Sequence, residues 1–137
     1  MGMFSSDMVI ISGKAAKPAE MRFTSTGTAV TKFSIPVDRS YKDKSTNEWV
    51  KKTIWYNVSV WGKFAETCNA RIEKGVAVMV RGTLEHDEHG GPHIWTAQDG
   101  TPRSSFEIKA DNFGGVTFLS DAQFTSAGHD ELDGIPF

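Results

Sequence analysis

The sequence predicts an all-β fold: a five-stranded Greek-key β-barrel with one short helix between the third and fourth strands. Three observations lead to this prediction. Residues 53–61 alternate between apolar and polar side chains, as a half-buried strand does. Several other segments have strand-like patterns, whereas only residues 63–74 show a helical period. Because five or six short strands cannot bury both faces as an open sheet, we expect them to close on themselves.

Length and composition are typical of one soluble domain. The chain has 137 residues, one cysteine and no run of about 18 apolar residues, so nothing in it is expected to span a membrane. The first seven residues do not resemble a signal peptide. A single cysteine excludes an internal disulfide and fits a reducing compartment, so we expect a cytoplasmic protein.

Charge is divided unevenly along the chain. All 15 Lys and Arg residues lie in residues 1–119, against 13 of the 17 acidic residues, which leaves +2 there and −4 in residues 120–137. The net charge of −2 therefore hides a mildly basic body and an acidic tail. A basic body is compatible with a nucleic-acid ligand, which the total charge alone would disfavour.

The first strands are separated by turn signals. Residues 8–15 read as a strand that Pro18 interrupts and residues 20–24 resume, and residues 25–27 form a turn. Residues 28–39 alternate well, with Pro36 marking an edge or a bulge because proline cannot donate to a ladder.

Residues 38–52 break the alternation and predict a long polar hairpin loop. Basic and aromatic residues are interleaved there, as single-stranded nucleic acid requires, although an ordinary solvated loop is about as compatible with the pattern. These residues are Arg39, Lys42, Lys44, Lys51 and Lys52, with Tyr41 and Trp49 among them.

The strand at residues 53–61 is the most informative segment. Its apolar face carries Ile54, Tyr56, Val58 and Val60, and its other face carries Trp55, Asn57, Ser59 and Trp61. Asn and Ser are poor core residues, so the second face should meet water and still holds two indoles. Stacking of nucleobases would explain them, but burial inside a sandwich or a subunit interface remains open on this strand alone.

The remaining elements follow in order. Residues 63–74 form an amphipathic helix with Phe64, Cys68 and Ile72 on its apolar face, and Gly75 as its stop. Cys68 is expected to be a core residue and not a nucleophile. Residues 76–85 and 104–110 are strands, the latter with Phe106 and Ile108 inward, and residues 116–119 are a last short strand. Residues 86–103 form a long polar excursion that contains Trp95.

This order of elements fits the OB-fold, whose outer strands and loops bind oligomers. In that frame the aromatic residues of the second-to-third loop, the third strand and the fourth-to-fifth loop are expected to line one groove. They are Tyr41, Trp49, Trp55, Trp61 and Trp95. The basic residues expected to bind phosphates are Lys14, Arg22, Arg39, Lys42, Lys44, Lys51, Lys52, Lys63, Arg81 and Arg103.

Several motifs resemble bacterial and phage single-stranded DNA-binding proteins. They are Gly27–Val30 with Phe33-Ser34, residues 41–44, residues 55–63, Lys74-Gly75, Arg81-Gly82, and Trp95 followed by Gln98-Asp99-Gly100. The resemblance implies a non-enzymatic protein that coats ssDNA in replication, recombination and repair, forms a homotetramer, and stacks bases on Tyr41, Trp55, Trp61 and Trp95. Trp is usual in the family at the first position and Phe at the third, and both residues present here retain a π-face. Trp49 has no clear counterpart in the family.

The last residues resemble the family's acidic tip, which recruits enzymes such as helicases, nucleases and primase. We expect a binding domain at residues 1–119, a linker at 120–129 and a partner-binding tip at 130–137. The tip residues are Asp130, Glu131, Asp133, Ile135, Pro136 and Phe137, while Gly134 stands where the family usually has an acid. A partner would need an apolar pocket rimmed by Lys or Arg.

Other classes of function are less well supported. No phosphate-cradling loop, nucleophile elbow or convincing pair of carboxylates indicates an enzyme, and no cofactor is expected. His86, Asp87, Glu88, His89 and His93 offer zinc-ligand types, but they lie on a predicted loop and match no known spacing, so no metal site is assigned. An OB-fold module that binds protein or oligosaccharide is the alternative from another class.

Overall fold

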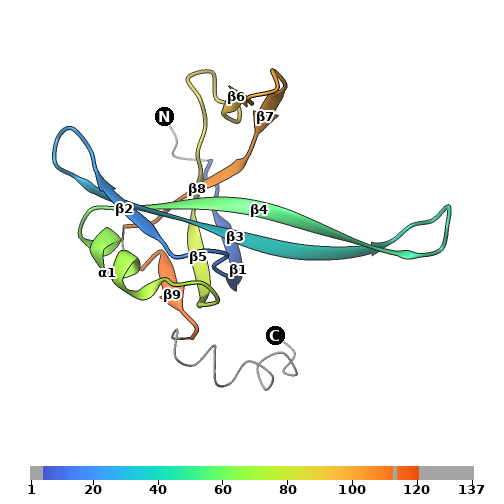
Figure 1. The fold of residues 1–137 in the computed structure, drawn as a ribbon, viewed down its shortest axis with the longest axis horizontal. Coiled ribbons are helices and arrows are strands. Elements are labelled where there is room, and N and C mark those ends of the chain that lie inside the picture. The colour runs from blue at the N-terminus through green and yellow to red at the C-terminus, as the bar shows by residue number, and fades with distance from the viewer. Residues whose placement is uncertain (1–4, 113, 121–137) are drawn as a thin grey trace.

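The computed structural model describes residues 5–112 and 114–120. Its strands are β1 (Val9–Lys14), β2 (Glu20–Phe23), β3 (Ala29–Lys42), β4 (Trp49–Trp61), β5 (Ala77–Leu84), β6 (Ile94–Thr96), β7 (Pro102–Ser104), β8 (Phe106–Ala110) and β9 (Val116–Phe118), and its one described helix is α1 (Lys63–Arg71) (Figure 1). None of the helices in the described residues is long and apolar enough to cross a membrane.

One curled sheet forms the body of the molecule. Its strand order is β1-β5-β8-β4-β3-β2, with β9 added on β5, and β6 and β7 form a separate two-stranded sheet. All pairs are antiparallel except β4 with β8. The two end strands, β1 and β2, belong to one bent segment of chain, so the bend brings both ends of the sheet together.

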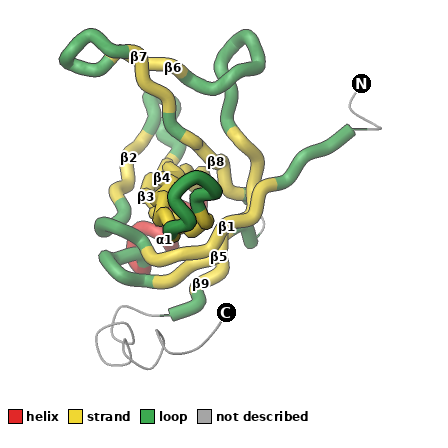
Figure 2. Tube along the Cα trace, turned by 90° about the vertical axis from the view of Figure 1, so that its right-hand side faces the viewer, coloured by secondary structure: helices red, strands yellow, loops and turns green. Residues whose placement is uncertain are grey.

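Backbone hydrogen bonds fix that bend. The Ala15 N–H donates to the Val76 carbonyl over 2.9 Å, and the Ala16 N–H donates to the Ser34 carbonyl over 3.1 Å. Figure 2, turned by 90°, shows the curled sheet behind the tip of the long β3–β4 hairpin. The predicted small barrel is therefore observed. Its described helix, α1, lies between β4 and β5, which correspond to the third and fourth strands of the prediction.

The core follows the predicted alternation. Val58 and Val60 of β4 are 1% exposed, and Ile35 of β3 and Ile108 of β8 are fully buried. Helix α1 contributes Ala65 and Cys68, with Ile72 just beyond its end, and the Thr31 hydroxyl donates to the Ala65 carbonyl over 2.6 Å. The helix ends at Arg71, earlier than predicted, and Gly75 takes its positive φ of 91° in the turn that follows.

The prediction of a polar loop over residues 38–52 is wrong in extent, because the loop is much shorter. Strands β3 and β4 remain paired from Asp38 opposite Thr53 out to Lys42 opposite Trp49, and only residues 43–48 connect them. The two strands form a ribbon that projects from the barrel (Figure 1). Because both faces of the ribbon are exposed, no core selects an alternating pattern, and backbone pairing continues without the signal that reveals a half-buried strand.

Two further corrections concern the second half of the chain. The polar excursion at residues 86–103 contains the β6–β7 hairpin, which the sequence did not indicate. Phe106, expected inward, is 56% exposed. It lies at the first position of β8, where its ring contacts that of Tyr56 at a centroid distance of 5.6 Å, so it covers the end of the barrel without entering the core. At Pro36 the expected edge is present, because pairing of β3 with β2 stops at Lys32.

Candidate nucleic-acid interface

The outer face of β4 carries the two tryptophans that the alternation placed there. Trp55 is 52% exposed and lies opposite Pro36, and Trp61 is partly buried opposite Val30. Between them, Asn57 accepts a hydrogen bond from the Ser34 hydroxyl through Oδ1 over 2.9 Å. The face is therefore polar and solvent-facing, and neither indole is sealed inside the core.

Trp61 is held in a more confined setting than Trp55. Its indole Nε1 is buried and has no hydrogen-bond acceptor among the residues that the structure describes. The Lys109 Nζ atom lies 5.8 Å from the ring centroid, within the range of a cation–π contact. A positive charge therefore stands beside a π-face on the outside of the barrel.

A small pocket opens next to Trp61. Its volume is about 100 Å³, and it is lined by side chains from β3, β4 and β8 and by the residue after β5: Lys32, Asn57, Val58, Ser59, Trp61, Glu85 and Glu107. The Ser59 hydroxyl donates a long hydrogen bond of 3.4 Å to Glu85 Oε1. One lysine and two carboxylates thus share the pocket with an indole.

Lys32 and Lys109 belong to this surface, and the sequence analysis assigned neither of them. Lys32 lies opposite Ser59 on β3, and Lys109 is paired with Ser59 on β8. Paired residues point to the same side of a sheet, so both lysines flank the tryptophan face. The alternation of residues 28–39 already placed Lys32 on a polar face, but only the strand register shows which neighbours share that face.

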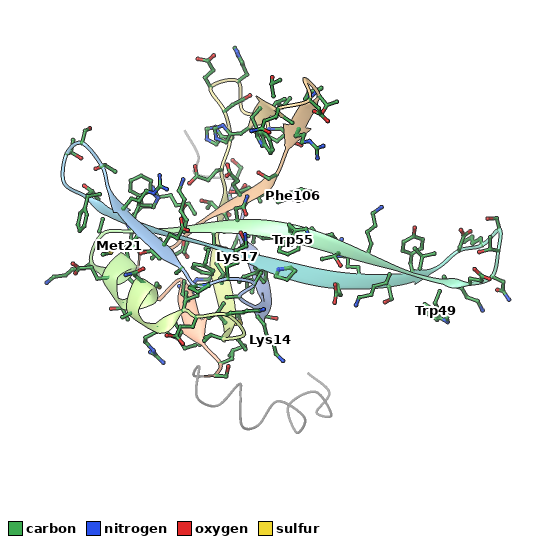
Figure 3. All side chains as sticks on the ribbon, viewed as in Figure 1. Lys14, Lys17, Met21, Trp49, Trp55 and Phe106 are labelled. Carbon is green, nitrogen blue, oxygen red and sulfur yellow. The ribbon has the colours of Figure 1, made fainter. Side chains whose placement is uncertain are left out.

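The ribbon separates the other two candidate aromatics. Tyr41 lies opposite Val50 and Trp49 lies opposite Lys42, so these adjacent pairs point to opposite faces. Tyr41 is 52% exposed and Trp49 is 72% exposed. Figure 3 shows Trp55 beside the barrel and Trp49 far out toward the tip. Trp49 shares the register face of Trp55, whereas Tyr41 lies on the opposite face of the ribbon.

Trp95 is placed by a separate element. It lies on β6 opposite Arg103 of β7 and is 50% exposed. Asp99 and Arg103 form an ion pair of 3.8 Å, and Asp99 also accepts hydrogen bonds from the Thr101 backbone and hydroxyl at 3.0 and 2.6 Å. The hairpin therefore presents an aromatic residue and a basic residue on its own sheet, apart from β4.

The predicted phosphate-binding residues differ in their surroundings. On the ribbon and its turn, Arg39, Lys42, Lys44 and Lys52 are exposed, as are Arg22 on β2 and Lys63 at the start of α1. Lys51 is exposed but pairs with Asp38 at 3.3 Å. Arg81 binds Asp111 through Nε at 3.0 Å, which ties β5 to the turn after β8. Lys14 ends β1, far in the strand order from β4.

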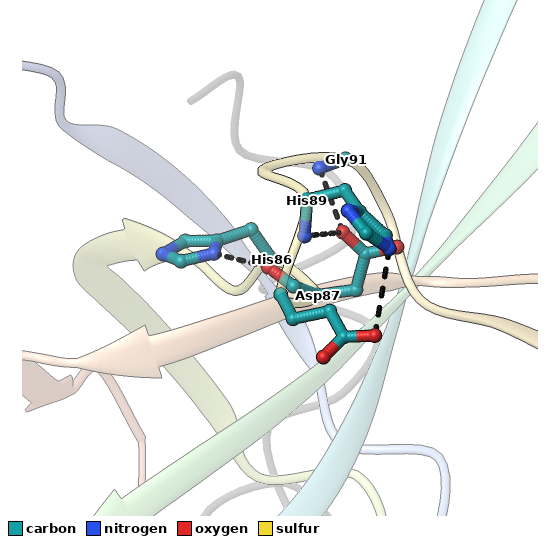
Figure 4. A network of polar contacts seen from close by, with 5 residues as sticks. His86, Asp87, His89 and Gly91 are labelled. Carbon is teal, nitrogen blue, oxygen red and sulfur yellow. Dashed lines mark hydrogen bonds and ion pairs between the residues drawn. The ribbon is translucent and has the colours of Figure 1, made fainter.

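The histidine-rich loop is organised by one aspartate (Figure 4). Asp87 Oδ1 accepts hydrogen bonds from the backbone N–H groups of His89 and Gly91 at 2.9 and 3.0 Å. These bonds, with that from Gly91 the largest cause, lower the pKa of Asp87. Within the described residues, no group of three or more His, Cys, Asp or Glu side chains converges as metal ligands would.

The predicted tip residues, from Asp130 to Phe137, lie outside the described residues, as does nearly all of the expected linker.

Fold and surface together define an OB-fold protein whose outer strand presents aromatic and cationic side chains. The model of the single-strand binding protein family matches residues 7–116. The chain belongs to this family of binding proteins.

Two curated relatives show the same relationship. The chain is 39% identical over 103 residues to single-stranded DNA-binding protein 2 of Chlorobaculum tepidum, covering 74% of this chain and 65% of the relative. It is 30% identical over 126 residues to the single-stranded DNA-binding protein of Treponema pallidum, covering 87% of this chain and 66% of the relative. The matched region therefore spans just under two thirds of each relative.

Solved structures support the predicted fold. A Plasmodium falciparum SSB in complex with ssDNA superposes with a TM-score of 0.69 at 23% identity, covering 88% of this chain and 100% of that chain. The small single-stranded DNA-binding protein of Streptomyces coelicolor superposes with a TM-score of 0.62 at 20% identity, covering 82% of this chain and 93% of that chain. These similarities confirm the OB-fold.

Proposed function

We propose that the chain binds single-stranded DNA, largely without sequence preference, through the outer face of β3, β4 and β8. The observation that carries the proposal is the pair of tryptophans, Trp55 and Trp61, on one solvent-facing strand, with Lys32 and Lys109 beside Trp61. Stacking of a base on an aromatic side chain contributes about 1–3 kcal/mol and tolerates any base. The lysines supply the charge that attracts phosphates.

The two tryptophans are six positions apart, which is about 20 Å along an extended strand. They therefore stack different nucleotides of one bound strand. Further contacts are proposed along the ribbon, through Tyr41 and Trp49 with the basic residues around them, and on the β6–β7 hairpin through Trp95 and Arg103. The bound DNA has to leave the β4 face to reach these elements, so the path is wrapped and not straight.

The decisive experiment is a titration of oligo-dT against intrinsic tryptophan fluorescence, with duplex DNA as the comparison. Quenching by oligo-dT is expected, and Trp55→Ala and Trp61→Ala are each expected to weaken binding by about fivefold or more. Phe23→Ala is the matched control, because Phe23 is 63% exposed but lies on β2 outside the proposed surface. Unchanged affinity in both tryptophan variants would refute this interface.

Salt separates DNA binding from the alternative of an oligosaccharide or protein module. For single strands, log K falls with log salt at about −0.7 per phosphate neutralised. A sugar ligand would respond little, since it has no phosphates to release counterions. A flat salt dependence would favour the alternative module.

We further propose that the protein acts as a homotetramer in replication, recombination and repair. Exposed apolar side chains on β1 and β5 support self-association. Met8, just before β1, and Ile10 are 61% and 59% exposed, and Met79 of neighbouring β5 is 39% exposed. Apolar side chains grouped on adjacent strands form a surface that a second copy of the chain can cover. Sedimentation velocity measures the resulting mass.

The acidic tip is proposed to recruit partner enzymes, such as helicases, nucleases and primase. Support comes from sequence chemistry: acidic residues precede Ile135, Pro136 and Phe137, which together suit an apolar pocket with a basic rim.

A further inference from the structure

The pocket beside Trp61 has an unusual charge for a surface that meets a polyanion. Among its lining residues, the cation of Lys32 faces two carboxylates, Glu85 and Glu107. Both glutamates are half-buried, and the pocket lies on the face of the tryptophans. Its volume of about 100 Å³ far exceeds the roughly 10–15 Å³ that one water needs.

A phosphate is a poor occupant of this pocket, because the two carboxylates outnumber the one lysine of its lining and would repel a phosphate at short range. Ionised carboxylates only accept hydrogen bonds, so the matching ligand group is an N–H or O–H donor. On a nucleic acid, such donors lie on the edges of the bases. A base that stacks near Trp61 would bring its edge to this pocket, since the indole is part of the wall.

We propose that this pocket reads the edge of one nucleobase and favours bases with an exocyclic amino group (cytosine, adenine or guanine) over thymine. This inference rests on the proposed ssDNA-binding function. The amino groups donate to Glu85 or Glu107, as glutamate does when it accepts from cytosine N4. Thymine places the O4 acceptor there, and this oxygen would face a carboxylate without a proton between them. Its one ring donor, N3–H, lies between two carbonyl oxygens that a carboxylate would repel.

The remaining polar groups fit an amino-bearing base. Asn57 uses Oδ1 to accept from Ser34, which leaves its amide N–H groups as donors. With the ammonium of Lys32, they can meet the ring acceptors that lie next to an amino group. Glu85 is already oriented by the Ser59 hydroxyl, so at least one carboxylate is positioned before a ligand arrives.

The test compares short oligo-dC and oligo-dT of equal length on the full chain and on Glu107→Gln and Glu85→Gln. Glutamine keeps the shape, removes the charge, and adds an N–H that thymine O4 can accept. We expect the dC-to-dT affinity ratio to fall by about fivefold or more in at least one variant. Glu88→Gln is the matched control, because it removes the same charge from the exposed loop outside the pocket.

The ratio separates this inference from general electrostatics. Loss of a negative charge strengthens binding of both oligonucleotides alike and leaves the ratio unchanged, as expected for Glu88→Gln. If both oligonucleotides bind but the ratio is the same in wild type and both pocket variants, the pocket does not read bases. If neither oligonucleotide binds the wild type, the proposed function itself fails.

A measurement on the wild type guards against variants that fold poorly. The indole N–H resonance of Trp61, assigned by comparison with Trp61→Phe, is expected to shift more on saturation with oligo-dC than with oligo-dT. Equal shifts from the two oligonucleotides would also overturn the proposal.

Discussion

Cys68 is fully buried on the inner face of α1, and burial changes the chemistry of its thiol. Desolvation raises the pKa of Cys68 from 9.0 to about 12, and the nearby charge of Arg71 opposes this only in part. The thiolate is the reactive form of cysteine, so the folded protein keeps Cys68 inert at neutral pH. This agrees with the expectation of a core residue.

The raised pKa predicts how Cys68 responds to reagents and to pH. At pH 8, labelling by DTNB is expected to be slow and to accelerate with urea in step with unfolding. Because the folded pKa exceeds the unfolded one, the thiol's contribution to stability is full below about pH 9 and is lost as the pH rises from 9 towards 12. Cys68→Ala should lack that alkaline loss, and fast labelling of the native protein would contradict the assignment.

Single residues also show what the alternation of the sequence can and cannot predict. It placed Trp55 and Trp61 outside the core correctly, because the apolar half of β4 has only one way to face inward. It put Phe106 on the correct side of β8 but could not show that the barrel ends there. It missed Lys109 because side chains that share a surface across strands are known only from the register.

At the scale of elements, the alternation of apolar and polar residues does not predict the full length of the β3–β4 ribbon. Asp38 accepts a hydrogen bond from the Thr53 hydroxyl at 2.7 Å and pairs with Lys51, and these contacts lower the pKa of Asp38, with the Thr53 bond the larger cause. Such cross-strand contacts help the ribbon to form without a core. The helix was easier to predict, because Phe64, Cys68 and Ile72 recur every four residues on a face that packs against the barrel.

The contact between β3 and α1 provides a test of how the helix is fixed to the barrel. Thr31 is fully buried, and its hydroxyl donates to the Ala65 carbonyl at 2.6 Å. Thr31→Val keeps the shape and removes this donor, so the free energy of unfolding is expected to fall by about 1 kcal/mol. Urea denaturation at fixed protein concentration measures the change.

Thr53→Val is the matched control for Thr31→Val. It removes the hydroxyl that bonds Asp38 in the exposed ribbon, where water replaces the lost hydrogen bond. We expect almost no change in the free energy of global unfolding for this variant, because the ribbon lies outside the core and only local pairing there is affected. Equal losses in both variants would show that the buried hydrogen bond does not hold α1 in place.

For the whole molecule, charge divides the chain into two parts, for which we propose different activities. Residues 1–119 carry +2 and present the lysines of the proposed DNA surface, while residues 120–137 carry −4. A negative segment has no affinity for phosphates, so it is not expected to add to DNA binding. Its acids and apolar residues suit a basic, hydrophobic pocket on another protein.

This division predicts that the two activities can be separated by deletion. Removal of residues 135–137 is expected to leave the affinity for oligo-dT within about twofold, since none of the proposed stacking or phosphate contacts is lost. The same deletion should abolish capture of purified helicases, nucleases or primase on the immobilised protein, because the apolar anchor is gone. Gln123→Ala with Thr125→Ala, in the expected linker, is the control that should retain both activities. Enzymes that still bind the truncated chain would place the docking element elsewhere, whereas a large loss of DNA affinity would show that these residues take part in DNA binding.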